Sequence, residues 1–332
     1  MAAALATDDY DAKQRCLKLE EILQDPRFPS PRFLSRRDNI PHRSYPVVAI
    51  DPLQGVWKLV DRTVIGQAVD KTFGKKAESM FRSGINSASS IPWVQISGEQ
   101  TIDQMRDLLQ TNLNFPIILK RRLACGSQAS HEMVIADDIE SAISAIHDVF
   151  RPGPVGVENG KPVGNRFLKG LARPANHFGF DVIAQEFIAD HGGILFKIYA
   201  VGKRLVVQPR PGVVRNLKGP SGSYYYFDSQ QLGRVTGLGR HEFDANTGRC
   251  IGTKAIMPSE KLAGEIVAAL SKELGLSLIG VDLVYDVGQK KYYVVDINYF
   301  PGYKGIACAN RWILQHICDL VWKTLHAVEE GK

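Results

Sequence analysis

The sequence has few of the features that mark secreted or membrane proteins. It has five cysteines and no CxxC pair, so a disulfide framework is not expected. Its longest apolar runs, such as 276–285, have about ten residues, whereas a membrane-spanning helix needs about 20. The first residues lack the basic flank and apolar core of a signal peptide. We therefore expect a cytoplasmic protein, possible also in the nucleus, with no membrane partner.

The segment 191–227 contains no acidic residue, and its basic residues account for the whole net charge of +6. The segment contains six basic residues, and the rest of the chain has 35 basic and 35 acidic residues. The six are Lys197, Lys203, Arg204, Arg210, Arg215 and Lys218. A basic coat over the whole surface would favour nucleic acid. One basic stripe favours a single anionic ligand instead; a solvated charged face is the alternative interpretation.

Several common catalytic motifs are also missing. The segment 156–162 fails the P-loop spacing by one residue and has Pro162 where a metal-binding Ser or Thr is needed. Gly237 and Gly239 lack the third glycine of a dinucleotide fingerprint, His131-Glu132 lacks a second histidine, and no G-x-S-x-G occurs. These absences argue against P-loop nucleotidases, dehydrogenases, zinc proteases and serine hydrolases.

The hydrophobic pattern predicts strands and helices that alternate without a strict βαβ rhythm. A content of 44% hydrophobic and 23% charged residues is typical of a globular protein, and 332 residues suggest about two domains. We expect an α+β (α/β) protein with mixed sheets. Strands are predicted at 93–96, 115–120, 131–135, 182–188, 194–201, 205–208, 224–227, 278–285 and 292–298, and helices at 101–113, 138–150 and 259–274.

The last two strands predict a pair of facing carboxylates. If the hairpin turns about Gln289, Asp282 lies directly opposite Asp296. We expect Asp296 and Asn298 to share one face of their strand with Tyr292 and Val294. Two carboxylates about 5 Å apart repel by roughly 3 kcal/mol at an effective dielectric of about 20.

A divalent cation would offset this repulsion. Mg²⁺ takes oxygen ligands, and Asn298 offers an amide oxygen beside the two carboxylates. A raised carboxyl pKa or solvent-facing side chains are the alternatives.

Basic residues on strands predict a phosphate site. Lys120 ends an apolar strand, and Lys197 lies within one, where lysine is disfavoured unless its face is solvated or meets an anion. One such lysine more often lies on a strand edge. Two of them, together with Arg62 and the basic stripe, favour phosphoryl or acyl-phosphate chemistry on a metal–nucleotide.

These residues lie in motifs that resemble the inositol 1,3,4-trisphosphate 5/6-kinase (inositol-tetrakisphosphate 1-kinase) family. The resemblance covers roughly residues 47–325. Its motifs are Asp51-Pro-Leu, Asp61-Arg62, Phe115-Pro-Ile-Ile-Leu-Lys120, Gly126-Ser-Gln-Ala-Ser-His131, Gln185-Glu-Phe-Ile188, His191-Gly-Gly-Ile-Leu-Phe-Lys197, Val207-Gln-Pro-Arg210-Pro, Gly280-Val-Asp282 and Val295-Asp-Ile-Asn-Tyr-Phe-Pro-Gly302-Tyr.

The resemblance implies an ATP-grasp fold, in which two α+β subdomains clasp ATP, with a shortened N-terminal domain. The implied divisions are a truncated N-terminal region at 1–90, a central subdomain at 91–184 with an insertion near 151–174, and a C-terminal subdomain with the magnesium hairpin at 185–332.

The resemblance also implies roles for individual residues. ATP would be bound by Arg62, Lys120, Gln185, Glu186, Phe187, Ile188 and Lys197. The inositol phosphate would be bound by His131, Lys197, Arg210, Asn298 and Gly302. One or two Mg²⁺ ions would be held by Asp282, Asp296 and Asn298. Lys197 and His131 are the expected catalytic residues, although a structural strand histidine is the alternative for His131.

The predicted function is an ATP- and magnesium-dependent kinase that transfers the γ-phosphate to a hydroxyl of an inositol tris- or tetrakisphosphate. The expected partners are ATP and the inositol polyphosphate, without nucleic acid, and the expected state is a monomer. Two alternatives are an ATP-grasp carboxylate–amine ligase and a non-catalytic inositol-phosphate-binding protein.

Overall fold

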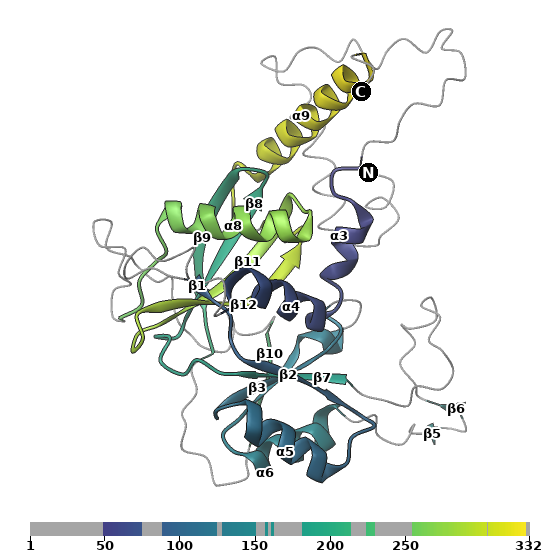
Figure 1. Cartoon of the computed structure of the whole chain (residues 1–332), viewed down its shortest axis with the longest axis vertical. Coiled ribbons are helices and arrows are strands. Elements are labelled where there is room, and N and C mark those ends of the chain that lie inside the picture. Colours follow the sequence, from purple (N-terminus) through teal and green to yellow (C-terminus); the bar gives the residue numbers. More distant parts are fainter. Residues whose placement is uncertain are drawn as a thin grey trace.

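The computed structural model describes residues 49–74, 88–124, 128–150, 157–158, 161–162, 181–213, 224–229, 254–303 and 305–329. Within them, two five-stranded sheets lie one above the other in the view of Figure 1, each with helices packed against it. The predicted insertion near 151–174 lies outside the described residues except for β5 (Val157–Glu158) and β6 (Lys161–Pro162), which pair with each other.

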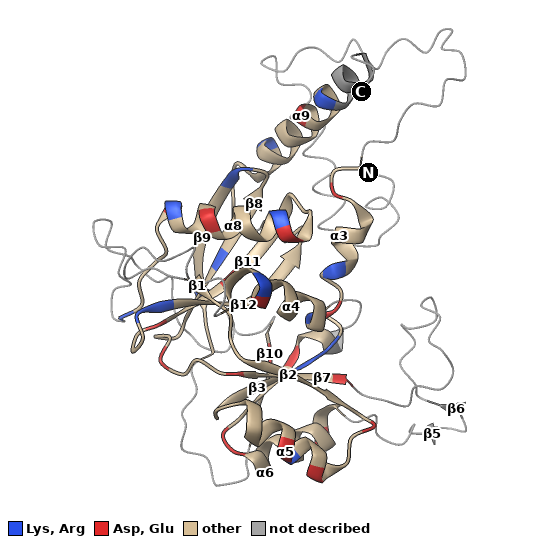
Figure 2. Ribbon diagram, viewed as in Figure 1, with Lys and Arg blue, Asp and Glu red and all other residues tan. Residues whose placement is uncertain are grey.

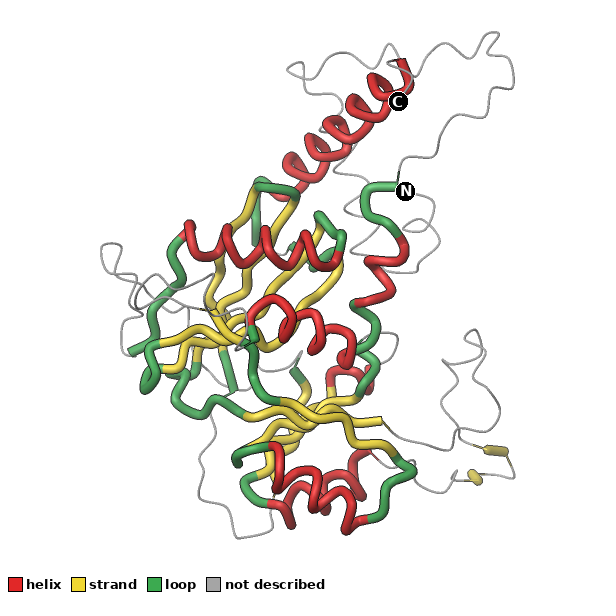
Figure 3. Tube along the Cα trace, viewed as in Figure 1, coloured by secondary structure: helices red, strands yellow, loops and turns green. Residues whose placement is uncertain are grey.

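The central sheet is antiparallel, with the order β10-β4-β3-β7-β2. Its strands are β2 (Trp93–Ser97), β3 (Ile117–Arg121), β4 (Glu132–Ala136), β7 (Asp181–Glu186) and β10 (Tyr224–Asp228). Its helices α5 (Ile102–Asn112) and α6 (Ile139–Ala145) cover the face that points away from the other sheet (Figure 3). Alternation along β3 places Ile117 and Leu119 in the core beneath these helices and leaves Ile118 and Lys120 for the opposite face.

The C-terminal sheet has the order β1-β12-β11-β8-β9 and is mixed, because β1 pairs with β12 in parallel. Its strands are β1 (Ala88–Ser89), β8 (Ile194–Val201), β9 (Arg204–Pro211), β11 (Leu278–Asp286) and β12 (Lys291–Tyr299). Helices α4 (Arg62–Phe73) and α8 (Glu260–Leu274) supply apolar residues to the core on one face, where they meet Phe196 and Ile198 of β8. Lys197 and Tyr199 therefore lie on the other face.

A β-bulge in β12 decides which face Asp296 occupies. Asp282 pairs with Asp296 as predicted, but the next pair is Leu283 with Val294, so one extra residue lies in β12. The prediction that Tyr292 and Val294 share a face with Asp296 was wrong, because Tyr292 and Val294 pack in the helix-covered core. The bulge reverses the alternation and turns Asp296 toward the opposite face.

Helix boundaries follow local signals that the sequence contains. The side chain of Thr101 forms a capping box at the start of α5, and the side chain of Ser259 caps α8. The predicted helix at 138–150 is α6 followed by one π-helical turn, η2 (Ile146–Phe150). A short 3₁₀ turn, η1 (Gln128–His131), precedes β4. Charged residues of both signs are interspersed on α4 and α8 (Figure 2).

Two further helices flank the C-terminal sheet. Helix α3 (Leu53–Lys58) follows Asp51, whose buried carboxylate accepts hydrogen bonds from the backbone N–H groups of Ser277 and Leu278. Helix α9 (Ala309–Glu329) projects away from the sheet (Figure 1), and His316 near its middle contacts the Ser277 hydroxyl at 2.7 Å. In the described part of the chain, neither α9 nor any other helix combines the length and apolar character that a membrane crossing requires.

Candidate active site

A cleft of about 490 Å³ is lined by residues of both sheets. Twelve of the thirteen predicted site residues line it: Arg62, Lys120, His131, Gln185, Glu186, Phe187, Ile188, Lys197, Arg210, Asp282, Asp296 and Asn298. Gly302 is not among the lining residues, and a Cβ placed there would meet no atom within 4 Å. The cleft thus joins residues far apart in sequence.

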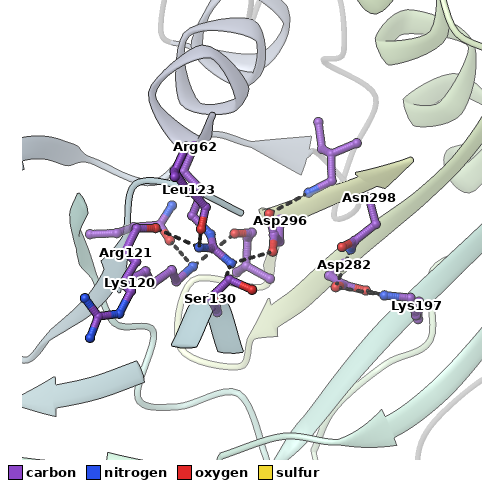
Figure 4. A network of polar contacts seen from close by, with 12 residues as sticks. Arg62, Lys120, Arg121, Leu123, Ser130, Lys197, Asp282, Asp296 and Asn298 are labelled. Carbon is purple, nitrogen blue, oxygen red and sulfur yellow. Dashed lines mark hydrogen bonds and ion pairs between the residues drawn. The ribbon is translucent and has the colours of Figure 1, made fainter. Parts of the chain in front are cut away.

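The predicted carboxylate pair has a lysine beside it. Lys197 on β8 pairs with Asp282 on β11, which pairs in turn with Asp296 on β12. The Lys197 ammonium donates to Asp282 Oδ1 at 2.8 Å and to Asp282 Oδ2 at 3.0 Å (Figure 4). Asn298 Nδ2 donates to the same Oδ2 at 3.3 Å. A cation of the chain itself therefore balances part of the carboxylate repulsion that the sequence predicts.

Burial and neighbouring charge pull the ionisation of this pair in opposite directions. Burial raises the pKa of Asp282, although the adjacent Lys197 ammonium counteracts this effect. Burial lowers the pKa of Lys197, but the charge and hydrogen bonds of Asp282 outweigh it, so the pKa of Lys197 is raised overall. The geometry favours an ammonium paired with a carboxylate, because two charge-assisted hydrogen bonds join them.

Arg62, the first residue of α4, contacts both the central sheet and Asp296, a candidate metal ligand. Its NH1 donates to the carbonyl oxygens of Arg121 at 2.7 Å and Leu123 at 3.2 Å, and its NH2 donates to that of Ser130 at 3.2 Å. The same NH2 lies 3.9 Å from Asp296 Oδ2 (Figure 4). The Arg62 side chain is 6% exposed, so it places a charge near the cleft and also holds two segments of the chain together through its hydrogen bonds.

Lys120 enters the cleft from the end of β3. Its ammonium donates to Gln185 Oε1 at 2.8 Å and to the Val295 carbonyl at 3.2 Å. Burial lowers the pKa of Lys120 to about 8, against the opposing pull of Asp296. Lys120 therefore bridges the central sheet, through Gln185, and the hairpin of the C-terminal sheet.

The segment after β7 forms a connection between the two sheets at one end of the cleft. The Phe187 N–H donates to the Pro116 carbonyl at 2.9 Å, and the Glu186 carboxylate accepts from the backbone and side-chain amides of Asn114. The Glu186 side chain thus holds Asn114, while Glu186 also lines the cleft. Apolar side chains from both sheets also line the cleft: Ile118, Met133, Leu195, Phe227 and Val284.

Sequence reasoning missed His191 as a site residue, although it lies in a quoted motif. The side chain is 4% exposed, lines the cleft and stands edge-on to Phe187 with ring centroids 5.6 Å apart. Its Nδ1 lies 2.8 Å from the Ile188 carbonyl, so Nδ1 carries the proton in this contact. A Cβ on Gly212 would approach His191 Nε2 to 2.8 Å, so glycine leaves room for the ring.

Arg210 and His131, the remaining predicted residues, line the cleft as well. Arg210 near the end of β9 donates to Tyr199 Oη at 2.9 Å and to Gln208 Oε1 at 3.0 Å. His131 ends η1, and its carbonyl accepts the Ser229 N–H at 2.9 Å. Four residues of the basic stripe lie in the described strands and turn (Lys197, Lys203, Arg204 and Arg210), and two of them line the cleft.

The oxygen donors in the cleft suit Mg²⁺. Asp282 and Asp296 face each other on paired strands, and Asn298 adds an amide group. Within the described ranges, no three His, Cys, Asp or Glu residues cluster closely enough to form a protein-only metal site. Mg²⁺ characteristically binds one or two carboxylates and completes its shell with water and phosphate oxygens, so this incomplete set fits the ion.

Comparison with known proteins agrees with this geometry. Residues 176–319 match the model of the inositol 1,3,4-trisphosphate 5/6-kinase ATP-grasp domain. The predicted resemblance to this family is confirmed. The chain has the ATP-grasp fold, as predicted.

Individual relatives are similar over longer stretches. Inositol-tetrakisphosphate 1-kinase 2 of Glycine max is 28% identical over 242 residues, which cover 71% of this chain and 63% of the relative. Inositol-tetrakisphosphate 1-kinase of Xenopus laevis is 25% identical over 283 residues, covering 82% of this chain and 58% of the relative. The chain thus spans about three fifths of the length of these relatives. Among solved structures, D-alanine–D-alanine ligase of Bacillus anthracis aligns over 85% of this chain and 72% of its own, with 13% identity and a TM-score of 0.43.

Proposed function

We propose that the protein is an ATP-dependent inositol polyphosphate kinase. The observation that carries the proposal is the single cleft in which the carboxylate pair Asp282 and Asp296 lies beside Lys120, Lys197 and Arg210. An excess of cations over carboxylates there suits two highly anionic ligands, the triphosphate of ATP and a phosphorylated ring. The family match over 176–319 supports the same assignment.

The adenine is proposed to bind against the apolar cluster that contains Ile118, Met133 and Phe227. The segment 185–188 lines the same cleft and offers backbone polar groups. Lys120 bonds the Val295 carbonyl and Arg62 lies 3.9 Å from Asp296, so we place the phosphates beside these two cations. Asp282, Asp296 and Asn298 would hold Mg²⁺, which when bound neutralises charge on the phosphoryl group being transferred.

Transfer requires positioning and charge stabilisation more than covalent chemistry by the protein. An inositol hydroxyl oxygen forms a bond to the γ-phosphorus and loses its proton to solvent, while the bond from that phosphorus to the β–γ bridging oxygen breaks and ADP leaves. We assign Lys197 to the stabilisation of charge on the transferred group, and Arg210, His131 and Asn298 to the phosphorylated ring. Gly302 lies outside the cleft lining in this structure, so its assignment to the ring rests on the resemblance alone.

Three further assignments are proposals of the same kind. The subdomain limits 1–90, 91–184 and 185–332 are supported by β2, β3 and β4, which all belong to the central sheet. However, β1 of the first division joins the C-terminal sheet, β10 of the third division joins the central sheet, and β7 crosses the limit between 184 and 185. The monomeric state and the cytoplasmic location also remain predictions from the sequence.

The proposal is tested by incubation with Mg²⁺ and ATP labelled in the γ-phosphate, with a panel of inositol tris- and tetrakisphosphates resolved by anion-exchange chromatography. We expect label in a product one phosphate larger than at least one acceptor. Absence of such a product from every acceptor would exclude the kinase function. ADP release that requires a carboxylate and an amine would instead indicate the ligase, whereas polyphosphate binding without any ADP release would indicate a non-catalytic binding protein.

A further inference from the structure

We propose that Tyr199 is a positioning residue that orients the polyphosphate-binding cations Arg210 and Lys197. This inference rests on the proposed function and adds a residue that the resemblance does not mark. Tyr199 is 4% exposed and is not among the residues that line the cleft. It therefore acts behind the two cations, both of which do line the cleft.

The Tyr199 side chain contacts both cations. Its hydroxyl oxygen accepts a hydrogen bond from Arg210 NH2 at 2.9 Å. Its ring centroid lies 5.9 Å from Arg210 Cζ and also 5.9 Å from Lys197 Nζ. Both distances fall within the range of about 6 Å for cation–π attraction. One buried ring thus gathers two cations from neighbouring strands.

The strand geometry explains why Arg210 needs such a partner. On β9, Val206 pairs with Tyr199, whereas Arg210 pairs with Leu195, which lies four residues before Tyr199 on β8. The Arg210 side chain must therefore extend along the sheet to reach the Tyr199 hydroxyl. A long arginine side chain loses considerable conformational freedom when it is held in one position. When the Tyr199 hydroxyl holds the guanidinium in place, this conformational entropy is already lost before the anion binds, so binding itself costs less free energy.

A second acceptor defines the same position. Gln208 lies on the same face of β9, two residues before Arg210, and its Oε1 accepts from Arg210 NH2 at 3.0 Å. The Gln208 Nε2 contacts the carbonyl of Gly305 at 3.4 Å, which connects this arrangement to the segment after β12. The Tyr199 ring is itself supported by Tyr303, whose centroid lies 5.8 Å away and whose hydroxyl donates to the Ala200 carbonyl.

The test uses Tyr199→Phe, which removes one oxygen atom and keeps the ring. We expect the affinity for inositol 1,3,4-trisphosphate, measured by calorimetry without nucleotide, to fall about tenfold, the effect of losing one hydrogen bond to a charged group. The affinity for a non-hydrolysable ATP analogue should stay within about twofold, because the substitution keeps the aromatic ring beside Lys197 and Arg210 is assigned to the inositol phosphate. The matched control is Tyr292→Phe, which removes a buried hydroxyl that bonds the Ile256 carbonyl in the same sheet.

A double-mutant cycle shows whether Tyr199 acts through Arg210. In an Arg210→Gln background, Tyr199→Phe should cause no further loss of trisphosphate affinity. Thermal unfolding of each variant distinguishes a loss of affinity from a loss of folded protein. If Tyr199→Phe is unstable, Gln208→Met removes the other hydrogen-bond acceptor of the Arg210 guanidinium and tests the same arrangement.

The outcomes separate this inference from the proposed function. If the wild-type protein binds no inositol phosphate, the proposed function fails. If the wild type binds it and Tyr199→Phe binds it equally well, or if Tyr292→Phe weakens binding as much, only the role of Tyr199 is overturned. An equal loss in the wild-type and Arg210→Gln backgrounds would likewise overturn action through Arg210.

Discussion

The Lys197 ammonium and the Asp282 carboxylate form a two-point ion pair across neighbouring strands, at 2.8 and 3.0 Å. Asp282 is also one of the two carboxylates that we assign to Mg²⁺. In that assignment Asp282 would serve both Lys197 and the ion, and the Lys197 ammonium, which lines the cleft, would remain available to phosphate oxygens.

The shared carboxylate predicts a severe defect in Asp282→Asn. Loss of its charge removes a metal ligand and leaves Lys197 without its carboxylate partner, so phosphoryl transfer should fall at least about 100-fold. The free energy of unfolding should fall by about 2–3 kcal/mol. Initial rates and denaturant unfolding measure the two effects. Asp286→Asn on the same strand is the control and should retain activity; a rate for Asp282→Asn near that of the control would contradict the assignment.

The ionisation of Lys120 predicts how nucleotide affinity depends on pH. Burial lowers the pKa of Lys120 from 10.5 to about 8, and phosphates bind the protonated form. Nucleotide affinity should therefore decline as the pH rises through about 8, with proton uptake on binding above that value. Fluorescent-nucleotide titrations from about pH 7 to 9.5 measure the decline. Lys120→Arg should remove this pH dependence, because arginine stays protonated; an unchanged pH profile would rule out Lys120 as its origin.

The free energy of unfolding should also depend on pH through Lys120, and the lowered pKa of Lys120 sets the direction of the change. Between about pH 8 and 10.5 the lysine of the unfolded chain binds its proton while buried Lys120 has lost it. The unfolded state then holds more protons, so the ligand-free protein should gain stability as the pH rises through this window. Thermal unfolding of the wild type and Lys120→Met checks the sign; a Lys120→Met curve with the same slope would assign the effect to other groups.

His191 predicts a defect confined to nucleotide binding. His191→Gln should weaken the hydrogen bond to Ile188 and the edge contact with Phe187, and so lower nucleotide affinity by about five- to tenfold. Trisphosphate affinity should change little. The exposed His147→Gln is the matched control. Equal losses for both ligands would indicate general damage to the cleft instead.

Arg62 predicts a defect in both stability and nucleotide binding. Arg62→Lys keeps the charge but cannot reach three carbonyl oxygens on two separate segments. We expect the free energy of unfolding to fall by about 2–3 kcal/mol, together with weaker nucleotide binding. Urea unfolding of this variant measures the loss. Arg106→Lys, on the outer helix α5, serves as the control. Equal stability of the two variants would contradict a stabilising role for the three Arg62 hydrogen bonds.

Local patterns in the sequence predict most of the fold. The strands and capped helices follow from alternation, from Thr101 and Ser259, and from apolar stripes, all of which act over a few residues. The pairing of Asp282 with Asp296 also follows, because the hairpin is local. The bulge in β12 does not, because one added residue leaves the apolar pattern on both sides intact, and only the packing of Val294 and Ile297 in one core reveals it.

Non-local contacts explain what the sequence leaves undetermined in the site. The sequence predicts Lys197 as an anion ligand, but its partner Asp282 lies 85 residues away. The pairing of β8 with β11 brings the two together, and no local pattern specifies that pairing. The same holds for Arg62, whose carbonyl acceptors lie 59 to 68 residues away. It also holds for Tyr199: strand alternation predicts that it shares a face of β8 with Lys197, but not that it contacts Arg210.

The most direct measurement quantifies ADP and phosphorylated inositol in the same reaction, for the wild type and for Asp296→Asn. With Mg²⁺, ATP and the best acceptor of the panel, the wild type should form the two products in a one-to-one ratio, and Asp296→Asn should form at least about 100-fold less of both. Full turnover by Asp296→Asn, or ADP formed without a phosphorylated inositol, would contradict phosphoryl transfer at the carboxylate pair.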